Sequence, residues 1–431
     1  MQQSLSSPSR AACGACDPDV TATNNADSTS VVRPGQPVNI AVALLTGGID
    51  RSYVFGLSMA LISKGICVDV IGSDSVDSSE MHTTSGLTFL NLQSTPLPSA
   101  SFVRRAWAVL AFYVRFVRYT SISKPKIFHI LWNNKLQFLD RTLLMLYFKL
   151  LGKKIAVTAH NVNARVRDGN DSVINRLTLR FQYQLADHIF VHTKRMKSEL
   201  VETFNVSEGA VSVIPFGVNN AVPDTYLTAA EAKERLGIGC GEKTILFFGA
   251  IWPYKGLEYL VAAFCRLANQ DADYRLIIAG AGKKGSEEYV AEIRKALSQV
   301  KPGRVIERIQ YIPDADTELY FKAADLSVLP YTMIFQSGVL VLSYSFGLPV
   351  VATNVGSFAE DIIPGKTGLM CRPRDGGDLA RAIEEYFDGE LYRNLERRRQ
   401  GIRDYAMARY SWDVVGDMTR KVYSELMAAH N

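Results

Sequence analysis

The chain has 431 residues, of which 47% are hydrophobic and 21% charged, and its formal net charge is +5. A chain of this length usually exceeds what one hydrophobic core serves, so two lobes are expected. The composition excludes a chain that is disordered throughout, and the mild charge by itself gives no support to nucleic-acid binding.

Residues 1–36 differ from the rest. They have few aromatic and many small polar side chains, which predicts a disordered tail. No basic head precedes an apolar run, so no secretory signal is expected, and no window is apolar enough for a membrane span. Cys13 and Cys16 form a C-x-x-C pair with no second pair or histidine cluster nearby, which favours coincidence over a zinc or redox site. The scattered cysteines are interpreted as thiols in a reducing cytosol.

Apolar runs then alternate with helical patterns. A strand at 38–45, the turn Thr46-Gly47-Gly48, a helix at 53–64 and a strand at 66–72 form a βαβ unit. A helix is expected at 138–151, and further strands at 127–132, 154–159, 186–192 and 212–217.

A polar stretch at 219–228 is interpreted as a linker, after which the alternation restarts. Strands are expected at 244–249, 274–280, 326–330 and 349–353, with helices between them. This order predicts an α/β protein with doubly wound parallel sheets. Ligands of such sheets bind beyond the carboxyl ends of the strands, so the loops there are the ones to search.

Two loops of the second half have the chemistry of an anion site. Gly249 ends a strand, and Lys255 stands just before the next helix, where its charge would add to the free N–H groups. The small-residue turn Gln336-Ser337-Gly338-Val339 opens another helix and could cradle a diphosphate. Taken singly, each has an ordinary alternative: a surface lysine, and a helix capped by Ser337.

Other polar residues near strand ends are candidates of equal or lower weight. Glu360 could accept hydrogen bonds from sugar or ribose hydroxyls, or it could be a first-turn glutamate that the helix dipole stabilises. His160 could bind the transferring sugar, although a lone histidine at a strand end is more often structural. Asp168 could be a base on the acceptor side, but an ion pair with neighbouring arginines is the better interpretation. Asp314 and Asp316 spell D-x-D, which we interpret as turn and cap chemistry rather than a metal site.

The segment from Phe102 to Lys124 combines arginines with a broad arc of aromatic and aliphatic side chains. Such a helix can lie in a membrane interface, and it can equally cover the sheet with its arginines in water. The clustering of the basic residues favours membrane contact slightly.

Taken in order, several short motifs resemble those of the family-4 (group 1) glycosyltransferases, from about residue 38 to 427. The motifs are Ala159-His160-Asn161, Ile214-Pro215-Phe216-Gly217-Val218, Phe248-Gly249 with Lys255-Gly256-Leu257, Ile278-Ala279-Gly280-Ala281-Gly282, Gly347-Leu348-Pro349-Val350-Val351-Ala352-Thr353, Val355-Gly356 with Glu360, Gly365-Lys366-Thr367-Gly368-Leu369, and Tyr410-Ser411-Trp412.

The resemblance implies the GT-B architecture: two Rossmann-like lobes facing a cleft, at 37–222 and 223–410, with a last helix at 411–431 returning to the first lobe. It implies transfer of a hexose or uronosyl unit from a nucleotide-diphosphate sugar to a glycan or lipid-linked acceptor. The transfer would retain configuration and need neither a metal nor a cofactor. Bacterial exopolysaccharide or lipopolysaccharide assembly, at the cytoplasmic face of a membrane, is the expected setting.

The resemblance also assigns residues. His160 and Glu360 would lie at the reacting sugar. Gly249, Lys255, Ile312 and the turn from Gln336 to Val339, with Ser337 and Gly338, would bind the donor. Apart from the resemblance, Gly47, Gly48 and Asp168 are the candidates for the acceptor side.

The chain departs from the family pattern at three positions. Ala250 stands for an arginine, and Ile334 and Leu342 stand for paired glutamates. Two alternatives therefore stay open. One is an inverting glucuronosyltransferase-like enzyme with Asp168 or Asp50 as base, and the other is a nucleotide-sugar-binding protein without catalysis.

Overall fold

A computed structural model describes residues 40–93, 101–134 and 136–429, apart from the side chain of Arg167. The predicted tail at 1–36, with Cys13 and Cys16, lies outside the described residues. The elements that follow all belong to one compact unit.

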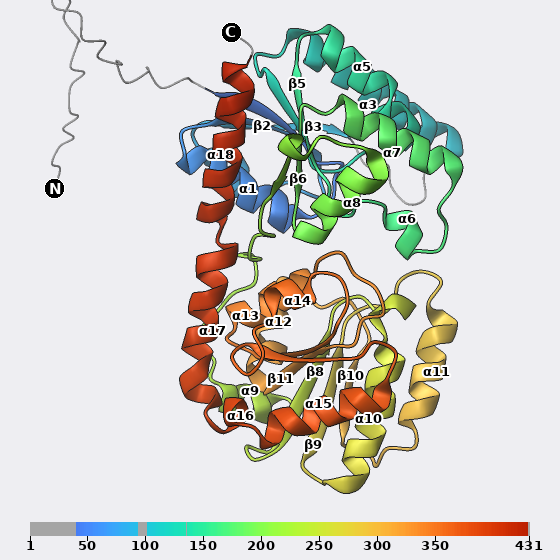
Figure 1. Ribbon diagram of the computed structural model, residues 1–431, viewed down its shortest axis with the longest axis vertical. Helices are drawn as coiled ribbons and strands as arrows, with labels where there is room; N and C mark the ends of the chain where they lie inside the picture. The colour runs from blue at the N-terminus through green and yellow to red at the C-terminus, as the bar shows by residue number, and fades with distance from the viewer. Residues whose placement is uncertain (1–39, 94–100, 135, 430–431) are drawn as a thin grey trace, which may run out of the picture. The chain divides into compact units, whose positions relative to one another are not determined.

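The first lobe is built on a parallel sheet of seven strands in the order β3-β2-β1-β4-β5-β6-β7 (Figure 1). The strands are β1 (Ala41–Leu45), β2 (Cys67–Ser73), β3 (Leu87–Gln93), β4 (Ile127–Ile130), β5 (Lys154–Thr158), β6 (His188–Val191) and β7 (Val211–Val213). Alternate residues of β1 enter different clusters, with Val42 and Leu44 on one face and Ala43 and Leu45 on the other. Both faces of the sheet are therefore covered, which explains the unbroken apolar run.

The first-lobe helices form two layers. α1 (Arg51–Ser63) packs with α18 (Trp412–Ala428) on one face, while α3 (Phe102–Ile122), α5 (Leu143–Leu150), α7 (Val173–Leu185) and α8 (Lys194–Phe204) cover the other. Shorter helices are α2 (Ser79–Thr83), α4 (Gln137–Arg141), α6 (Ala164–Arg167) and the 3-10 turn η1 (Glu208–Ala210).

The single helix expected at 138–151 is two helices, α4 and α5. Thr142 separates them with φ −123° and ψ −87°, outside helical geometry, and its hydroxyl donates to the Phe138 carbonyl at 2.6 Å. The side chain supplies a local alternative to helical hydrogen bonding.

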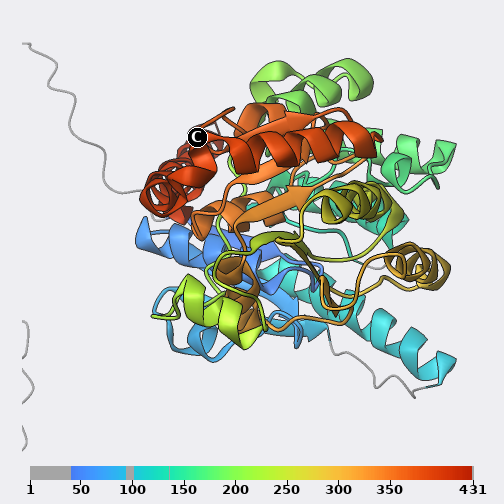
Figure 2. The same ribbon diagram turned by 90° about the horizontal axis from the view of Figure 1, so that it is seen from below.

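The second lobe has a parallel sheet of six strands in the order β10-β9-β8-β11-β12-β13. The strands are β8 (Lys243–Phe248), β9 (Tyr274–Ala279), β10 (Val305–Arg308), β11 (Leu326–Leu329), β12 (Val350–Thr353) and β13 (Gly368–Cys371). Its helices lie on both faces of the sheet (Figure 2). They are α9 (Ala229–Arg235), η2 (Pro253–Lys255), α10 (Leu257–Gln270), α11 (Glu287–Leu297), α12 (Asp314–Ala323), α13 (Gly338–Ser345), α14 (Phe358–Asp361), α15 (Gly376–Asp388), α16 (Glu390–Arg393) and α17 (Leu395–Tyr410).

The last helix, α18, packs on α1 of the first lobe. Trp412 begins it, and the indole N–H donates to the Val218 carbonyl at 2.8 Å. A Cβ at Gly56 of α1 would lie 2.0 Å from the Trp412 ring, so only glycine lets the two helices approach this closely. Lys64 adds ion pairs to Asp413 and Asp417 of α18. Among the described residues, no helix meets the length and hydropathy that crossing a bilayer requires.

Candidate functional site

Two loops of the second lobe are packed tightly against each other at the carboxyl edge of the sheet. They follow β8 and β11, which are parallel neighbours. Gly256 has φ +64°, and a Cβ there would lie 2.0 Å from the Pro330 carbonyl oxygen. The Thr332 N–H donates to the Tyr254 carbonyl at 2.8 Å. The sequence places a glycine where the backbones meet, and the tertiary packing requires it.

Lys255 and Ser337 both come close to the ring of Tyr331. The Lys255 ammonium lies 3.8 Å from the centre of that ring, and only 8% of the residue is exposed. Burial raises the pKa of the Tyr331 phenol, and the nearby Ser337 hydroxyl opposes that shift. The predicted lysine and the predicted small-residue turn are therefore brought together.

The N-terminus of α13 is the second half of this arrangement. The Ser337 hydroxyl caps the helix by accepting the Leu340 N–H at 3.3 Å. The first N–H groups of a helix have no intrahelical partner, so Gly338 and Val339 present positive backbone ends. Gly249 has φ +102°, and its Cβ position is 3.4 Å from Val339, which fixes the end of β8 beside the turn. Gln336 is half-buried just before the cap.

The predicted donor residue Ile312 and the two positions where the family has glutamates are apolar and buried. Ile312 packs into a cluster with Leu246 and Ile277, so its main chain, rather than its side chain, is what it can offer a ligand. Ile334 and Leu342, at the positions of the family's glutamates, are 8% and 6% exposed. Nothing carboxylate-like stands at these two places.

His160 lies in a group of aromatic rings at the carboxyl edge of the first sheet. Its ring stacks on Trp132 at 4.1 Å and meets Tyr53 edge-on at 4.7 Å. Phe216 also contacts it edge-on, at 6.1 Å, and lies 3.2 Å from the Cβ position of Gly338. The group therefore lies beside the N-terminus of α13.

A chain of hydrogen bonds fixes the tautomer of His160. His192 Nδ1 lies 3.1 Å from the Ile214 carbonyl, which can only accept, so this nitrogen carries the proton. Burial lowers the pKa of His192 to about 4, so its Nε2 is unprotonated and accepts from His160 Nδ1 at 2.9 Å. His160 Nε2 is then a bare acceptor, buried and without a partner among the described residues. Burial and the neighbouring histidines hold the pKa of His160 well below its usual value, so it serves as a neutral acceptor rather than an acid.

The acceptor-side candidates differ in their surroundings. Gly47 and Gly48 have φ +59° and +71°, and a Cβ on either would meet neighbouring loops within 3 Å. Asp50 caps α1 by accepting the Tyr53 N–H at 3.0 Å, and burial raises its pKa. Asp168 is exposed at the end of α6.

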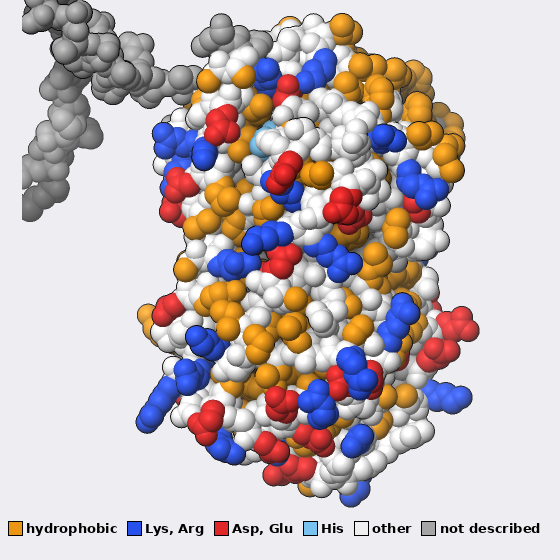
Figure 3. Space-filling model, viewed as in Figure 1, with side chains coloured by type: hydrophobic (Ala, Val, Ile, Leu, Met, Phe, Trp, Pro, Cys, Tyr) orange, Lys and Arg blue, Asp and Glu red, His pale blue; other side chains and the backbone are white. Residues whose placement is uncertain are grey.

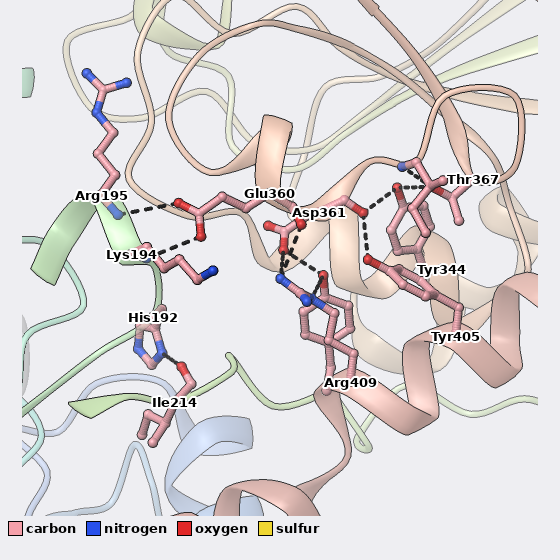
Figure 4. Close-up of polar contacts among 12 residues, drawn as sticks. His192, Lys194, Arg195, Ile214, Tyr344, Glu360, Asp361, Thr367, Tyr405 and Arg409 are labelled. Carbon is pink, nitrogen blue, oxygen red and sulfur yellow. Dashed lines mark hydrogen bonds and ion pairs between the residues drawn. The ribbon is translucent and has the colours of Figure 1, made fainter.

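Glu360 of the second lobe forms hydrogen bonds with the first lobe (Figure 4). Its carboxylate accepts the backbone N–H groups of Lys194 at 3.2 Å and Arg195 at 3.4 Å, in the first turn of α8. Negative charge is favoured there by the helix dipole. The neighbouring Asp361 is held by Tyr410 and Arg409. A contact of Glu360 with the sugar stays a prediction.

Asp314 and Asp316 lie in the first turn of α12, after Pro313. Acidic side chains are favoured at that position for the same electrostatic reason. The described residues contain no group of three or more possible metal ligands among histidine, cysteine, aspartate and glutamate.

Sequence reasoning gave no role to Tyr331, Phe216 or His192. A signal existed for His192, because it follows β6 just as His160 follows β5, and neighbouring parallel strands end at the same edge. For Tyr331 and Phe216, only the packing shows which loops their rings join.

Comparison with known proteins assigns this arrangement to a class. A sequence profile described as Glycosyltransferase Family 4 matches residues 46–222, and one described as Glycosyl transferases group 1 matches residues 242–388. The chain belongs to the family-4, group 1 glycosyltransferases, and it is an enzyme of the glycosyltransferase class.

Named relatives agree with this class. A D-inositol 3-phosphate glycosyltransferase of Pseudarthrobacter chlorophenolicus is 30% identical over 222 residues, which is 51% of each chain. The match thus spans about half the length of that relative. A protein of the same name from Corynebacterium jeikeium is 24% identical over 399 residues, or 89% of this chain and 93% of the relative.

A solved structure shows the same fold. The Anabaena protein HepE, in complex with UDP and glucose, superimposes with a TM-score of 0.70 over 90% of this chain and all of that chain, at 15% identity. The two parallel sheets with their helices are therefore the GT-B fold, as predicted. The family assignment favours an enzyme over the non-catalytic alternative.

Proposed function

We propose that this enzyme transfers a hexose or uronosyl unit from a nucleotide-diphosphate sugar to a glycan or lipid-linked acceptor, with retention and without a metal ion or cofactor. The observation that carries the proposal is the convergence of Lys255 and the α13 N-terminus around Tyr331. The bound UDP in HepE supports a nucleotide-sugar donor for a chain of the same fold.

The chemistry follows from where charge develops. As the anomeric bond breaks, negative charge grows on the diphosphate. The Lys255 ammonium and the N–H groups of Gly338 and Val339 would stabilise that charge from fixed positions. Because these groups are preorganised, little reorganisation is needed during the reaction. The apolar surroundings of Tyr331 strengthen the electrostatic effect.

His160 is assigned to positioning of the sugar in this proposal. Its bare Nε2 would accept a hydrogen bond from a sugar hydroxyl. Glu360 would act at the sugar when its carboxylate is not engaged by α8. Ribose recognition is expected to differ from the family pattern, because Ile334 and Leu342 are apolar.

An inverting mechanism is the second candidate, and one observation favours it. Asp50 lines a cavity of about 330 Å³ together with Phe216, Gly338 and Leu342. Burial raises its pKa, which makes the carboxylate a stronger proton acceptor than a free aspartate. The anomeric configuration of the first-formed product, measured by NMR, distinguishes the two mechanisms.

The acceptor is proposed to be presented at a membrane surface, at its cytoplasmic face. The first lobe exposes large apolar side chains on its outer helical layer, and Figure 3 shows them gathered over α5 and α3. On α3, Phe102 is 85% exposed and Trp107 65%. The patch continues on α5 and α7 with Leu143, Leu146, Leu150, Val173, Ile174, Leu177 and Phe181.

Basic side chains border this apolar patch, as expected for an interface with anionic lipid. Arg104, Arg105, Arg115 and Arg118 of α3 are exposed. Phe112 and Phe116 of α3 face the core, so part of this segment covers the sheet. The outer arc is therefore made by Phe102, Trp107, Leu110 and Val114. Exopolysaccharide or lipopolysaccharide assembly is the proposed setting.

Replacement of Lys255 tests the proposed function. Lys255→Met keeps most of the apolar contact with Tyr331 and removes the charge. We expect turnover to fall by roughly 10²- to 10³-fold, the usual effect of losing one preorganised donor, with weaker donor binding. Release of UDP from UDP-sugars, with and without acceptor, is the measurement.

Lys283→Met is the matched control, since Lys283 is exposed on the next loop and lies 5.9 Å from the Trp252 ring. It should keep wild-type turnover. Near wild-type turnover in Lys255→Met would overturn the assignment of the diphosphate site.

A further inference from the structure

A second cavity opens at the carboxyl edge of the first sheet, separate from the Asp50 cavity. It has a volume of about 210 Å³ and lies among the ends of β4 and β5, the short helices α4 and α6, and α7. At ~30 Å³ per water molecule, it has room for about seven waters. A single sugar ring with its substituents is a ligand of this size.

The lining of this cavity is polar but one-sided in charge. Among the described residues that line it are six side-chain amides and the two guanidinium groups of Arg141 and Arg165, and none of these described residues is a carboxylate. The amides are Asn133, Gln137, Asn161, Asn163, Asn175 and Gln182. Amides and guanidinium groups form the donor-rich surface that a hydroxylated anion prefers.

Arg141 carries a positive charge without an ionic partner among the described residues. Its Nη1 donates to two neutral oxygens, Asn175 Oδ1 at 2.9 Å and Thr178 Oγ1 at 3.4 Å. Its Nε is buried and has no hydrogen-bond partner among those residues. Burial lowers the pKa of Arg141, and the neighbouring Arg165 adds to this shift while Tyr183 and Asp140 oppose it. A partly buried charge of this kind is costly unless an anion meets it.

The nearest acidic groups are engaged elsewhere. Asp140 accepts the Tyr113 hydroxyl at 2.9 Å, and burial raises its pKa to about 6. Asp171 accepts from the Asn175 amide at 2.7 Å and pairs with the exposed Arg176. Asn175 therefore stands between Asp171 and Arg141, so the charge of Asp171 reaches the guanidinium only through a neutral amide. Asp140 interacts with Arg141 through its charge, and no hydrogen bond or ion pair joins the two among the described residues.

The cavity is adjacent to the proposed transfer site. His160 lines it, and the buried Nε2 of that residue is a bare acceptor. The ring of His160 contacts Phe216, which in turn lies against Gly338 at the start of α13. A ligand in the cavity would be separated from the proposed diphosphate site by this one layer of rings.

We infer that this cavity binds the acceptor through an anionic group, a sugar carboxylate or a sugar phosphate, held by Arg141 with Arg165 at the rim. That the ligand is the acceptor rests on the proposed function. That it is an anionic sugar rests on the cavity alone. The amides bind the hydroxyl groups of the same sugar, and Trp132 provides an apolar wall.

Binding of small probes tests the ligand class without any donor. Glucose, glucuronate and glucose 1-phosphate are titrated by saturation-transfer NMR against the full chain. We expect both anions to bind about 10- to 100-fold more tightly than glucose, the usual gain from a charge-assisted contact. The two anions show which source of negative charge the cavity prefers. Equal binding of all three overturns the inference.

Two variants test whether Arg141 causes the preference for anionic sugars. Arg141→Gln removes the charge while an amide can still donate to Asn175, so the preference for anions should fall by at least about 10-fold while glucose binding is kept. Arg420→Gln removes an exposed arginine of α18 and should change neither. An anion preference unaltered in Arg141→Gln overturns the inference. Selective anion binding without sugar transfer from any donor would instead contradict the proposed function and leave the ligand class standing.

Discussion

The two lobes share one architecture but differ on their outer surfaces. In the first lobe, α3, α5 and α7 turn large apolar side chains outward, such as Phe102, Ile174 and Leu150. In the second lobe, the outward faces carry ion pairs, as between Arg381 and Asp378 on α15 at 2.8 Å. The fold requires only that the inner face of each helix be apolar. The outer face therefore indicates the surroundings of each lobe. For the second lobe these are water, and for the first lobe we propose that they are lipid.

The lobes differ at their strand ends too. The second lobe presents a lysine and a helix N-terminus, which suit a diphosphate. The first lobe presents neutral histidines and an amide-lined cavity, which suit hydroxyl groups and one negative charge. The difference divides the proposed reaction into a donor side and an acceptor side. Each prediction below tests one property in which the two lobes differ.

Acidification should weaken the first lobe most. His129, His160, His188 and His192 are buried there, and burial lowers the pKa of each, to about 3 for His129 and about 4 for His192. The unfolded chain binds their protons near pH 6.5, so stability falls as pH drops from 6.5 toward 4. At pH 5, His129 and His192 should each cost about 2 kcal/mol. Asp140, whose pKa is raised to about 6, offsets about 1 kcal/mol of this loss.

Urea unfolding at pH 7 and pH 5 measures the effect. His129→Gln should reduce the loss on acidification by about 2 kcal/mol, because one titrating group is removed. His82→Gln, at an exposed position, should leave the loss as in wild type. If His129→Gln shows the same pH dependence as wild type, the buried neutral histidines are not its source.

The contact between the two donor loops can be broken at one glycine. In Gly256→Ala, the new Cβ would lie 2.0 Å from a backbone oxygen while the residue keeps a φ of +64°. We expect a loss of about 3 kcal/mol in stability, from left-handed strain and overpacking together. Weaker binding of UDP should accompany it, because the loops move apart.

Gly152→Ala in the first lobe is the matched control. Its φ is +68°, and a Cβ there would have nothing within 4 Å. It should cost about 1 kcal/mol, the strain alone. Equal losses at Gly152 and Gly256 would show that the close packing of the two loops is unimportant.

The smallest effect concerns the outer apolar patch. The double variant Phe102→Ser/Trp107→Ser should lower binding to vesicles of phosphatidylethanolamine and phosphatidylglycerol by about 10-fold, since two large exposed side chains leave the interface. Sedimentation with the vesicles is the measurement, and transfer to a water-soluble acceptor should be unchanged.

Tyr311→Ser/Met407→Ser is the control, because it removes two exposed side chains of the second lobe. It should leave vesicle binding as in wild type. Equal sedimentation of wild type and both double variants would contradict the membrane proposal.

Much of the fold could be predicted because its central strands are buried on both faces. β1, β5, β8 and β11 have nearly continuous apolar runs, and the expected ranges agree with the structure within a few residues. The strands without a prediction, β3, β10 and β13, are all edge strands. An edge strand is covered on fewer sides, so it lacks the continuous apolar run from which a strand is predicted.

The sequence by itself predicted the doubly wound α/β class, the loops to search, and Lys255 with the turn at Ser337 as candidates, because strand ends, glycines and helix caps are local signals. The GT-B architecture was implied by the family resemblance of the motifs. The tertiary structure decided which of these groups meet. Tyr331 brings the lysine to α13, and Ile214 fixes the tautomer of His160 through His192. Arg141 faces amides in a cavity whose described residues include no carboxylate. These outcomes depend on distances and burial between residues far apart in the chain, and no local pattern encodes them.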